Sequence, residues 1–300
     1  MRILVTGITG QVGAALRRAL EGRGEIIAAD RNTLDLAKPE LLGARLDALA
    51  PDLIINPAAY TAVDRAETDD ALALTVNATS PGVLARWAAA ADVPLIHFST
   101  DYVFDGTGTR PWREDDATGP LSVYGKSKLA GERAIRASGG PHLIIRTSWV
   151  YAASGRNFLT TMARLARERA ELRVVADQIG APTSAALIAS VVTQVLDGRN
   201  AQELRQLFRT AGGLVHVCAA GETSWHGFAC EIVAGLRHRK VHLAVERITA
   251  VPTAAYPTPA ARPANSRLDC GRLIEVFGFI APDWRQGLDQ ELDAYVASIT

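Results

Sequence analysis

Short apolar runs alternate with longer stretches of mixed hydrophobic and polar residues along the first half of this 300-residue chain. The runs have the length and composition of buried parallel strands, and the stretches between them are long enough for helices. The runs lie at residues 2–6, 25–29, 53–56, 93–98 and 143–146. Strands and helices that alternate in this way form right-handed crossovers and a parallel sheet. We therefore expect an α/β fold with a doubly wound, Rossmann-type parallel sheet whose strand ends face one crevice.

The alternation persists beyond residue 150 but becomes looser. Helical patterns occupy 157–168, 225–236, 270–277, 284–298 and a stretch ending at 196, and short strands are expected at 172–176 and 214–218. Four prolines between 252 and 263 predict an irregular segment. We expect residues 1–150 to form a dinucleotide-binding half. Residues 151–300 should complete the sheet and form a smaller, mostly C-terminal lobe that binds substrate.

The composition narrows the class of ligand. The chain is 48% hydrophobic, and its 32 basic and 32 acidic residues cancel, so no general attraction to nucleic acid or to an anionic membrane is expected. The three cysteines lack CxxC spacing, which argues against a disulfide framework and a structural zinc site. We find no signal peptide and no apolar run approaching the roughly twenty residues of a membrane span. We expect a cytoplasmic protein that holds a small molecule by local groups.

A glycine turn follows the first strand. Gly7, Gly10 and Gly13 have the spacing G-x-x-G-x-x-G and open a helix, so the backbone can approach a phosphate and offer it the free N–H groups of the helix start. The alternative is a tight turn without a ligand. Asp30, after the second strand, suits a ribose hydroxyl, whereas Arg31 suits a 2′-phosphate. The choice between NADH and NADPH therefore stays open.

Proton-transfer chemistry concentrates between residues 97 and 128. Thr100 ends the fourth strand, and Tyr124 and Lys128 lie four residues apart on one face of a predicted helix. Alone, a tyrosine and lysine at this spacing are common on structural helices. With the glycine turn upstream, however, the sheet should bring both sets of groups to one crevice. We expect the lysine cation to lower the pKa of Tyr124 and make proton exchange feasible.

Other candidates are less specific. Asp101 could contact substrate or act as a turn carboxylate, Trp149 could be a flat wall or core, and His97 is expected to be core. The histidines lack metal-like spacing with carboxylates. Donors for a diphosphate are expected at Arg262 and in the segment Asn265-Ser266-Arg267.

Six segments together resemble the extended short-chain dehydrogenases/reductases and, among them, the dTDP-4-dehydrorhamnose reductase family. They lie at 6–13, 99–104, 124–132, 146–151, 177–183 and 262–268. The resemblance implies Thr100, Tyr124 and Lys128 as the catalytic set. It implies that the dTDP-deoxysugar substrate is held at Asp101 and Trp149, together with Thr100 and Tyr124. The implied NADH or NADPH contacts are Gly7, Gly10, Gln11, Val12, Gly13, Asp30, Asp35, Leu36, Ala59, Tyr60, Thr61, Tyr124 and Lys128.

The implied reaction is reduction of the C4 ketone of dTDP-6-deoxy-L-lyxo-4-hexulose to dTDP-L-rhamnose. The nicotinamide would supply the hydride and Tyr124 the proton. Two alternatives stay open: another nucleotide-sugar 4-reductase or epimerase, such as one that forms 6-deoxy-L-talose, and a non-catalytic regulatory subunit. The intact set of Thr100, Tyr124 and Lys128 argues against the regulatory subunit.

The chain departs from the family pattern at two positions. Where members that dimerise around magnesium carry carboxylates, this chain has Ala15 and Ala186, which cannot bind a cation. We expect no metal site, and either a monomer or a homodimer that no metal bridges.

Overall fold

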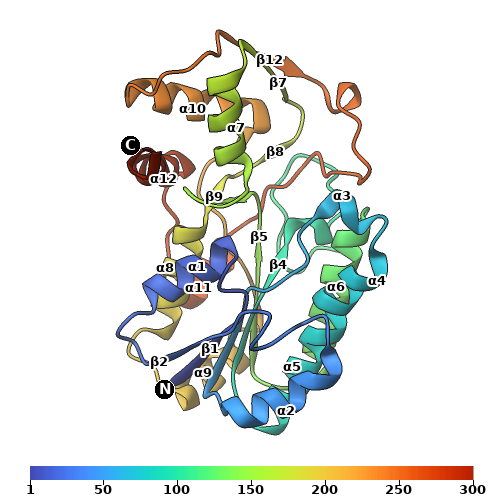
Figure 1. Ribbon diagram of the computed structural model, residues 1–300. Coiled ribbons are helices and arrows are strands. Elements are labelled where there is room, and N and C mark those ends of the chain that lie inside the picture. Colours follow the sequence, from blue (N-terminus) through green and yellow to red (C-terminus); the bar gives the residue numbers. More distant parts are fainter. Residues whose placement is uncertain (300) are drawn as a thin grey trace.

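A six-stranded, entirely parallel sheet forms the centre of the molecule in a computed structural model that describes residues 1–299 (Figure 1). The strand order is β10-β5-β4-β3-β1-β2. The strands are β1 (Arg2–Val5), β2 (Glu25–Ala28), β3 (Leu53–Asn56), β4 (Leu95–Thr100), β5 (His142–Thr147) and β10 (Leu214–His216). The predicted doubly wound fold is confirmed. β4 ends later than its apolar run, because Ser99 and Thr100 still pair with Arg146 and Thr147 of β5.

Successive side chains point to opposite sides of the sheet, and the strands other than the edge strand β2 are largely buried on both faces. Ile3, Val5 and Ile55 belong to one hydrophobic cluster, whereas Leu4 and Ile54 belong to the cluster on the other side. This burial explains why the strands appear in the sequence as continuous apolar runs.

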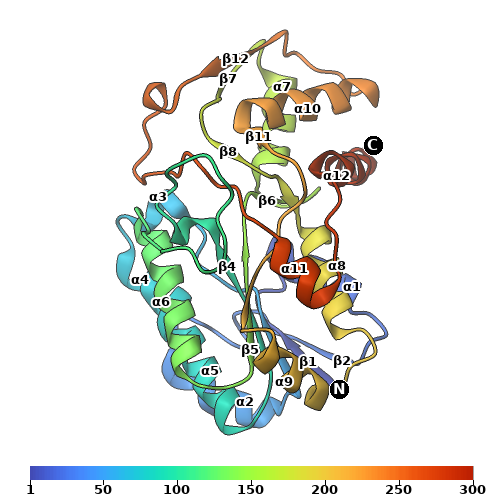
Figure 2. The ribbon, with the colours of Figure 1, turned by 180° about the vertical axis from the view of Figure 1, so that it is seen from behind.

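Helices cover both faces of the sheet (Figures 1 and 2). The first cluster contains side chains of α1 (Gln11–Ala19), α8 (Ala185–Leu196), α9 (Ala201–Thr210) and α11 (Gly271–Phe277). The second contains side chains of α2 (Pro39–Leu49), α5 (Ser80–Ala90) and α6 (Val123–Ala137). The helix-rich stretch before residue 91 is divided into α3 (Val63–Ala66), α4 (Asp70–Leu74), the π-helical turn η1 (Thr75–Thr79) and α5.

A smaller lobe lies beyond the carboxyl ends of the strands (Figure 1). Its core consists mainly of side chains from α7 (Phe158–Glu168), α10 (Trp225–His238) and α12 (Trp284–Ile299) packed with the parallel pair β7 (Glu171–Val175) and β12 (Arg247–Val251). Two short pairs join the lobe to the sheet: β6 (Val150–Tyr151) with β9 (Thr183–Ser184), and β8 (Ile179–Gly180) with β11 (Thr223–Ser224). Short 3₁₀ turns are η2 (Asp101–Val103) and η3 (Thr253–Ala255).

The sequence pattern did not predict α2, α9, β12 or the two-residue strands β6, β8, β9 and β11. β12 pairs with β7 alone, and only Val251 of its five residues is fully buried, so it lacks an apolar run. Among the described residues, no helix has both the length and the apolar composition needed to cross a membrane.

Candidate functional site

The glycine turn joins the end of β1 to the start of α1 at the point where the strand order reverses, between β1 and β3. Gly7 has a left-handed φ of 56°, and a Cβ there would lie 2.8 Å from Cα of Ala58. A Cβ on Gly13 would lie 2.2 Å from the Gly7 carbonyl oxygen. Only glycine therefore allows the helix to start this close to the strand.

The turn also offers polar groups without partners inside the protein. Gly10 is the N-cap of α1, so the first N–H groups of the helix are free to face an anion. The side-chain oxygen Oε1 of Gln11 is buried and has no hydrogen-bond partner among the described residues. A buried acceptor without a partner, next to a close-packed glycine turn, fits a bound dinucleotide.

We expect Gly13→Ala to weaken NADPH binding at least ~10-fold, because an added methyl group must push the helix start away from Gly7. Fluorescence titration with NADPH measures this effect. Gly43→Ala in α2 is the matched control, because nothing lies within 4 Å of its added Cβ. Equal affinity in Gly13→Ala and the wild type would contradict this use of the turn.

The residues after β2 form a tight turn around Asp30, the residue predicted to contact the ribose of the cofactor. Asp30 accepts hydrogen bonds from the backbone N–H groups of Asn32 and Thr33 and from the Thr33 hydroxyl. The backbone hydrogen bond from Thr33 is the largest of the contributions that lower the pKa of Asp30. Further along, Asp35 caps the backbone N–H of Ala37, and Leu36 is buried. Arg31 is exposed beside this turn, whereas both oxygens of the Asp30 carboxylate accept hydrogen bonds within it.

Asn77 links the loop after β3 to α6. Its side chain accepts from the Tyr60 backbone N–H at 2.8 Å, donates to the Tyr60 carbonyl at 3.0 Å and donates to the Ser127 hydroxyl at 3.0 Å. It thus fixes the Ala59-Tyr60-Thr61 loop against α6. This role of Asn77 was not predicted, although an asparagine inside an apolar helical stretch was the available signal.

Thr100, Tyr124 and Lys128 meet where β4 ends against α6. Lys128 is buried and donates through Nζ to the carbonyl oxygen of Phe98 at 2.6 Å. The Thr100 hydroxyl hydrogen-bonds with the Tyr124 phenol and lies 3.0 Å from Oδ1 of Asp101. Gly125 allows this approach, because a Cβ there would lie 2.2 Å from the Tyr102 carbonyl oxygen.

The predicted lowering of the Tyr124 pKa by Lys128 is not found in this structure. Burial raises the pKa of Tyr124, the Thr100 hydrogen bond opposes this rise, and the charge of Asp101 adds to it. Burial also lowers the pKa of Lys128 to about 8 against the opposing influence of Glu132. A buried lysine shifted this far is a weak source of positive charge for Tyr124.

Asp101 is buried directly beside Thr100. Burial raises the pKa of its carboxyl to about 6, against hydrogen bonds from Ser266 and Thr100. The position therefore combines a buried carboxyl with the Thr100 hydroxyl and with Ser266 of the 262–268 segment. A carboxylate that only caps a turn does not need to be buried with a raised pKa, so this environment marks Asp101 as a candidate functional residue.

Trp149 stands at the edge of the lobe rather than in its core. It is partly exposed, has a left-handed φ of 49°, and stacks on Trp225 at a centroid distance of 3.6 Å. The Trp225 indole donates to Gln178 at 3.1 Å. Gly180 makes room, because a Cβ there would lie 2.7 Å from the Trp149 ring. The stacked pair offers a flat wall for a base or a sugar.

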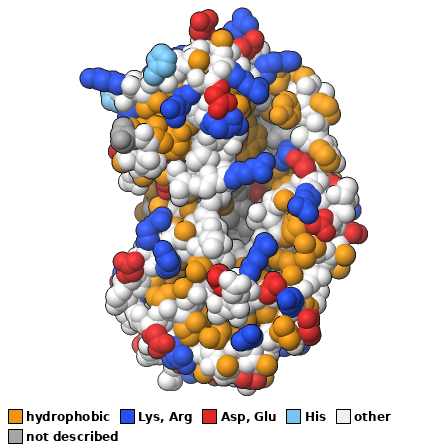
Figure 3. Space-filling model, in the orientation of Figure 1, with side chains coloured by type: hydrophobic (Ala, Val, Ile, Leu, Met, Phe, Trp, Pro, Cys, Tyr) orange, Lys and Arg blue, Asp and Glu red, His pale blue; other side chains and the backbone are white. Residues whose placement is uncertain are grey.

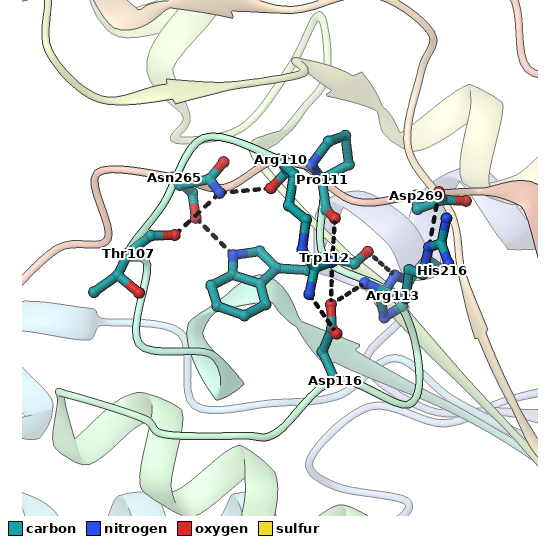
Figure 4. A network of polar contacts seen from close by, with 9 residues as sticks. All are labelled: Thr107, Arg110, Pro111, Trp112, Arg113, Asp116, His216, Asn265 and Asp269. Carbon is teal, nitrogen blue, oxygen red and sulfur yellow. Dashed lines mark hydrogen bonds and ion pairs between the residues drawn. The ribbon is translucent and has the colours of Figure 1, made fainter.

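The segment expected to bind a diphosphate is engaged within the protein. The Asn265 amide donates to the carbonyl oxygens of Thr107 and Arg110, and thereby pins the loop between β4 and α6 (Figure 4). Arg267 pairs with Glu222, and Arg262 pairs with Asp64 at 2.7 Å. Asn265 and Arg267 therefore shape the site instead of reaching into it.

No group of three or more His, Cys, Asp or Glu side chains is placed to hold a metal within residues 1–299. Ala15 and Ala186 both line a groove of about 680 Å³ formed by α1 and α8. On the face shown in Figure 3, the surface is hollowed between the lobe and the sheet, with Lys and Arg side chains beside the hollow.

Comparison with known proteins places these residues in a family. Residues 1–297 match the model described as the RmlD substrate binding domain. A dTDP-4-dehydrorhamnose reductase of Burkholderia thailandensis is 49% identical over 287 residues, covering 95% of this chain and 96% of that protein. Two solved structures of dTDP-4-dehydrorhamnose reductases are similar. The one from Clostridium acetobutylicum has a TM-score of 0.88 at 36% identity and covers 98% of this chain and 99% of that chain. The one from Bacillus anthracis, in complex with NADP, has a TM-score of 0.85 at 32% identity and the same coverage.

Proposed function

Since this chain belongs to the RmlD substrate binding domain family, we propose that it is a dTDP-4-dehydrorhamnose reductase, an NAD(P)H-dependent oxidoreductase. One observation carries the proposal: Thr100, Tyr124 and Lys128 lie together near the carboxyl end of β4. The glycine turn follows the carboxyl end of β1, on the same side of the parallel sheet. The substrate is proposed to be dTDP-6-deoxy-L-lyxo-4-hexulose and the product dTDP-L-rhamnose.

The residues present fit a nicotinamide dinucleotide. Gly7, Gly10, Gly13 and the buried acceptor of Gln11 would hold its phosphates and neighbouring groups, and the 59–61 loop would lie against its rings. The remaining proposed contacts are Val12, Asp30, Asp35 and Leu36. When bound, this cofactor supplies the hydride that reduces the C4 ketone.

The protein's own residues supply the proton and orient the ketone. Tyr124 donates its phenolic proton to the C4 oxygen, and Thr100 holds that oxygen through its hydroxyl. Lys128 would hold the ribose of the nicotinamide, and in its charged form it would favour the loss of the proton from Tyr124, four residues earlier on α6. Asp101 and Trp149 contact the deoxysugar nucleotide, which lies between the sheet edge and the lobe. Residues 1–150 thus act as the cofactor half, and 151–300 complete the sheet and form most of the substrate lobe.

A coupled assay tests the proposal. The purified chain receives the 4-keto sugar nucleotide with NADPH or NADH, absorbance follows cofactor oxidation, and NMR identifies the sugar product. We expect oxidation and an L-rhamnose product. An L-talo product would instead assign the chain to a related 4-reductase, and an absence of turnover with both cofactors would favour a binding subunit.

We expect EDTA to leave activity and the oligomeric state unchanged, because alanines occupy positions 15 and 186 in the groove between α1 and α8. Turnover and size-exclusion chromatography with light scattering, each before and after EDTA treatment, measure this. Inactivation or dissociation that magnesium reverses would show that a cation is held by residues other than these two.

A further inference from the structure

A chain of buried hydrogen bonds connects Thr6, the residue after β1, to Lys128. The backbone N–H of Ala58 donates to the Thr6 hydroxyl at 3.3 Å, and that hydroxyl donates to Oδ1 of Asn56 at 2.6 Å. Nδ2 of Asn56 lies 3.0 Å from Nδ1 of His97, and Nε2 of His97 lies 3.2 Å from Nζ of Lys128. Thr6, Asn56, His97 and Lys128 are each at most 2% exposed, so the groups must satisfy one another.

The hydrogens along this line determine the state of the histidine. Because the Thr6 hydroxyl already receives the Ala58 hydrogen, its own hydrogen goes to Asn56, which therefore presents its NH₂ group to His97. Nδ1 of His97 must then be an acceptor. Reversing the Asn56 amide would take from the Thr6 hydroxyl the acceptor that it has here.

His97 is neutral, because burial lowers its pKa well below the usual value. A neutral imidazole whose Nδ1 is an acceptor carries its single N–H on Nε2. That N–H points at Nζ of Lys128, which can accept it only as an uncharged amine. The amine still has hydrogens to donate to the Phe98 carbonyl at 2.6 Å.

We propose that His97 is a positioning residue that, directed by Asn56, stabilises the neutral amine form of Lys128 in the free enzyme. When Lys128 takes up a proton, the ring must change tautomer and the Asn56 amide must reverse, so the two residues titrate as one unit. This inference rests on the proposed function, because it gives the histidine control over the pH at which the lysine becomes a cation beside Tyr124.

The other charged groups around this unit are few. On α6, Glu132 raises the pKa of Lys128 and Tyr124 is its neighbour along the helix. On β5, Arg146 is bound to Glu132 at 2.7 Å. Beyond β4, the charge of Asp101 acts on Tyr124. None of these side chains contacts the His97 ring in the way that Asn56 and Lys128 do.

The direct test is long-range ¹H–¹⁵N NMR of the full chain labelled with ¹⁵N-histidine, in which the His97 signals are those lost in His97→Gln. Above the lysine pKa of about 8 we expect the Nε2–H tautomer, and below it the Nδ1–H tautomer. A ring that keeps one tautomer between about pH 6 and pH 10 overturns the proposal. This readout needs no substrate, so it holds even if the proposed reaction is wrong.

The activity test uses the pH dependence of ketone reduction. Activity that needs the Lys128 cation falls as pH rises through the lysine pKa. The amide oxygen of His97→Gln can accept from the ammonium, so we expect its alkaline limb to move up by about one pH unit. Asn56→Leu should move the limb in the same direction, whereas His142→Gln, at the start of β5, should leave it unchanged. Unmoved limbs in both His97→Gln and Asn56→Leu would contradict the proposal.

Discussion

Tyr124→Phe lowers kcat for reduction of the 4-keto sugar nucleotide by about 10²–10⁴-fold, the usual contribution of a positioned general acid. The phenol is the group that hydrogen-bonds with Thr100 at the end of β4, and phenylalanine keeps its ring but has no proton to give. NADPH affinity stays near the wild-type value, because the glycine turn is untouched. Steady-state kinetics and a fluorescence titration measure the two effects separately.

Tyr102→Phe is the matched control for this variant. The Tyr102 ring packs edge-on against Tyr124 at a centroid distance of 5.5 Å, and its hydroxyl faces Arg262 rather than Thr100. We expect its kcat to fall by less than about tenfold. A near-normal rate in Tyr124→Phe, or an equal loss in both variants, would contradict Tyr124 as the proton donor.

Glu132→Ala destabilises the fold by about 3–5 kcal/mol, because it leaves the Arg146 cation buried without its counter-ion. Two parallel hydrogen bonds of 2.8 and 2.7 Å join the residues, whose side chains are only 2% and 3% exposed. Urea unfolding followed by circular dichroism measures the loss. The variant should also lower the pKa of Lys128, because Glu132 raises it.

An exposed ion pair provides the control. Arg164 and Glu168 on α7 are 2.7 Å apart, but their side chains are 59% and 51% exposed. Glu168→Ala should therefore cost less than about 1 kcal/mol. The double variant Glu132→Leu with Arg146→Met should recover most of the lost stability, because it removes both buried charges. A loss below about 1 kcal/mol in Glu132→Ala would refute the buried-charge explanation.

The sequence predicted the sheet because strands buried on both faces must be apolar throughout, as Leu53–Asn56 is up to its last residue. It missed β12, which is mostly exposed. The predicted family is confirmed. The roles of the individual site residues are proposals. The raised pKa of Tyr124 was not predicted, because it is set by burial in the folded protein. The roles of Asn77 and Asn265 were not predicted either, because their hydrogen-bond partners lie 17 to 158 residues away in the chain.

The position of β10 in the sheet has a consequence for how the chain folds as it is synthesised. β5, complete at Thr147, pairs with β4 on one edge, and its other edge waits for Leu214–His216. α8, which packs on α1, is also made late. Residues 1–147 therefore leave the ribosome with an open sheet edge and a partly uncovered apolar face. These are the features that chaperones bind and that aggregation exploits.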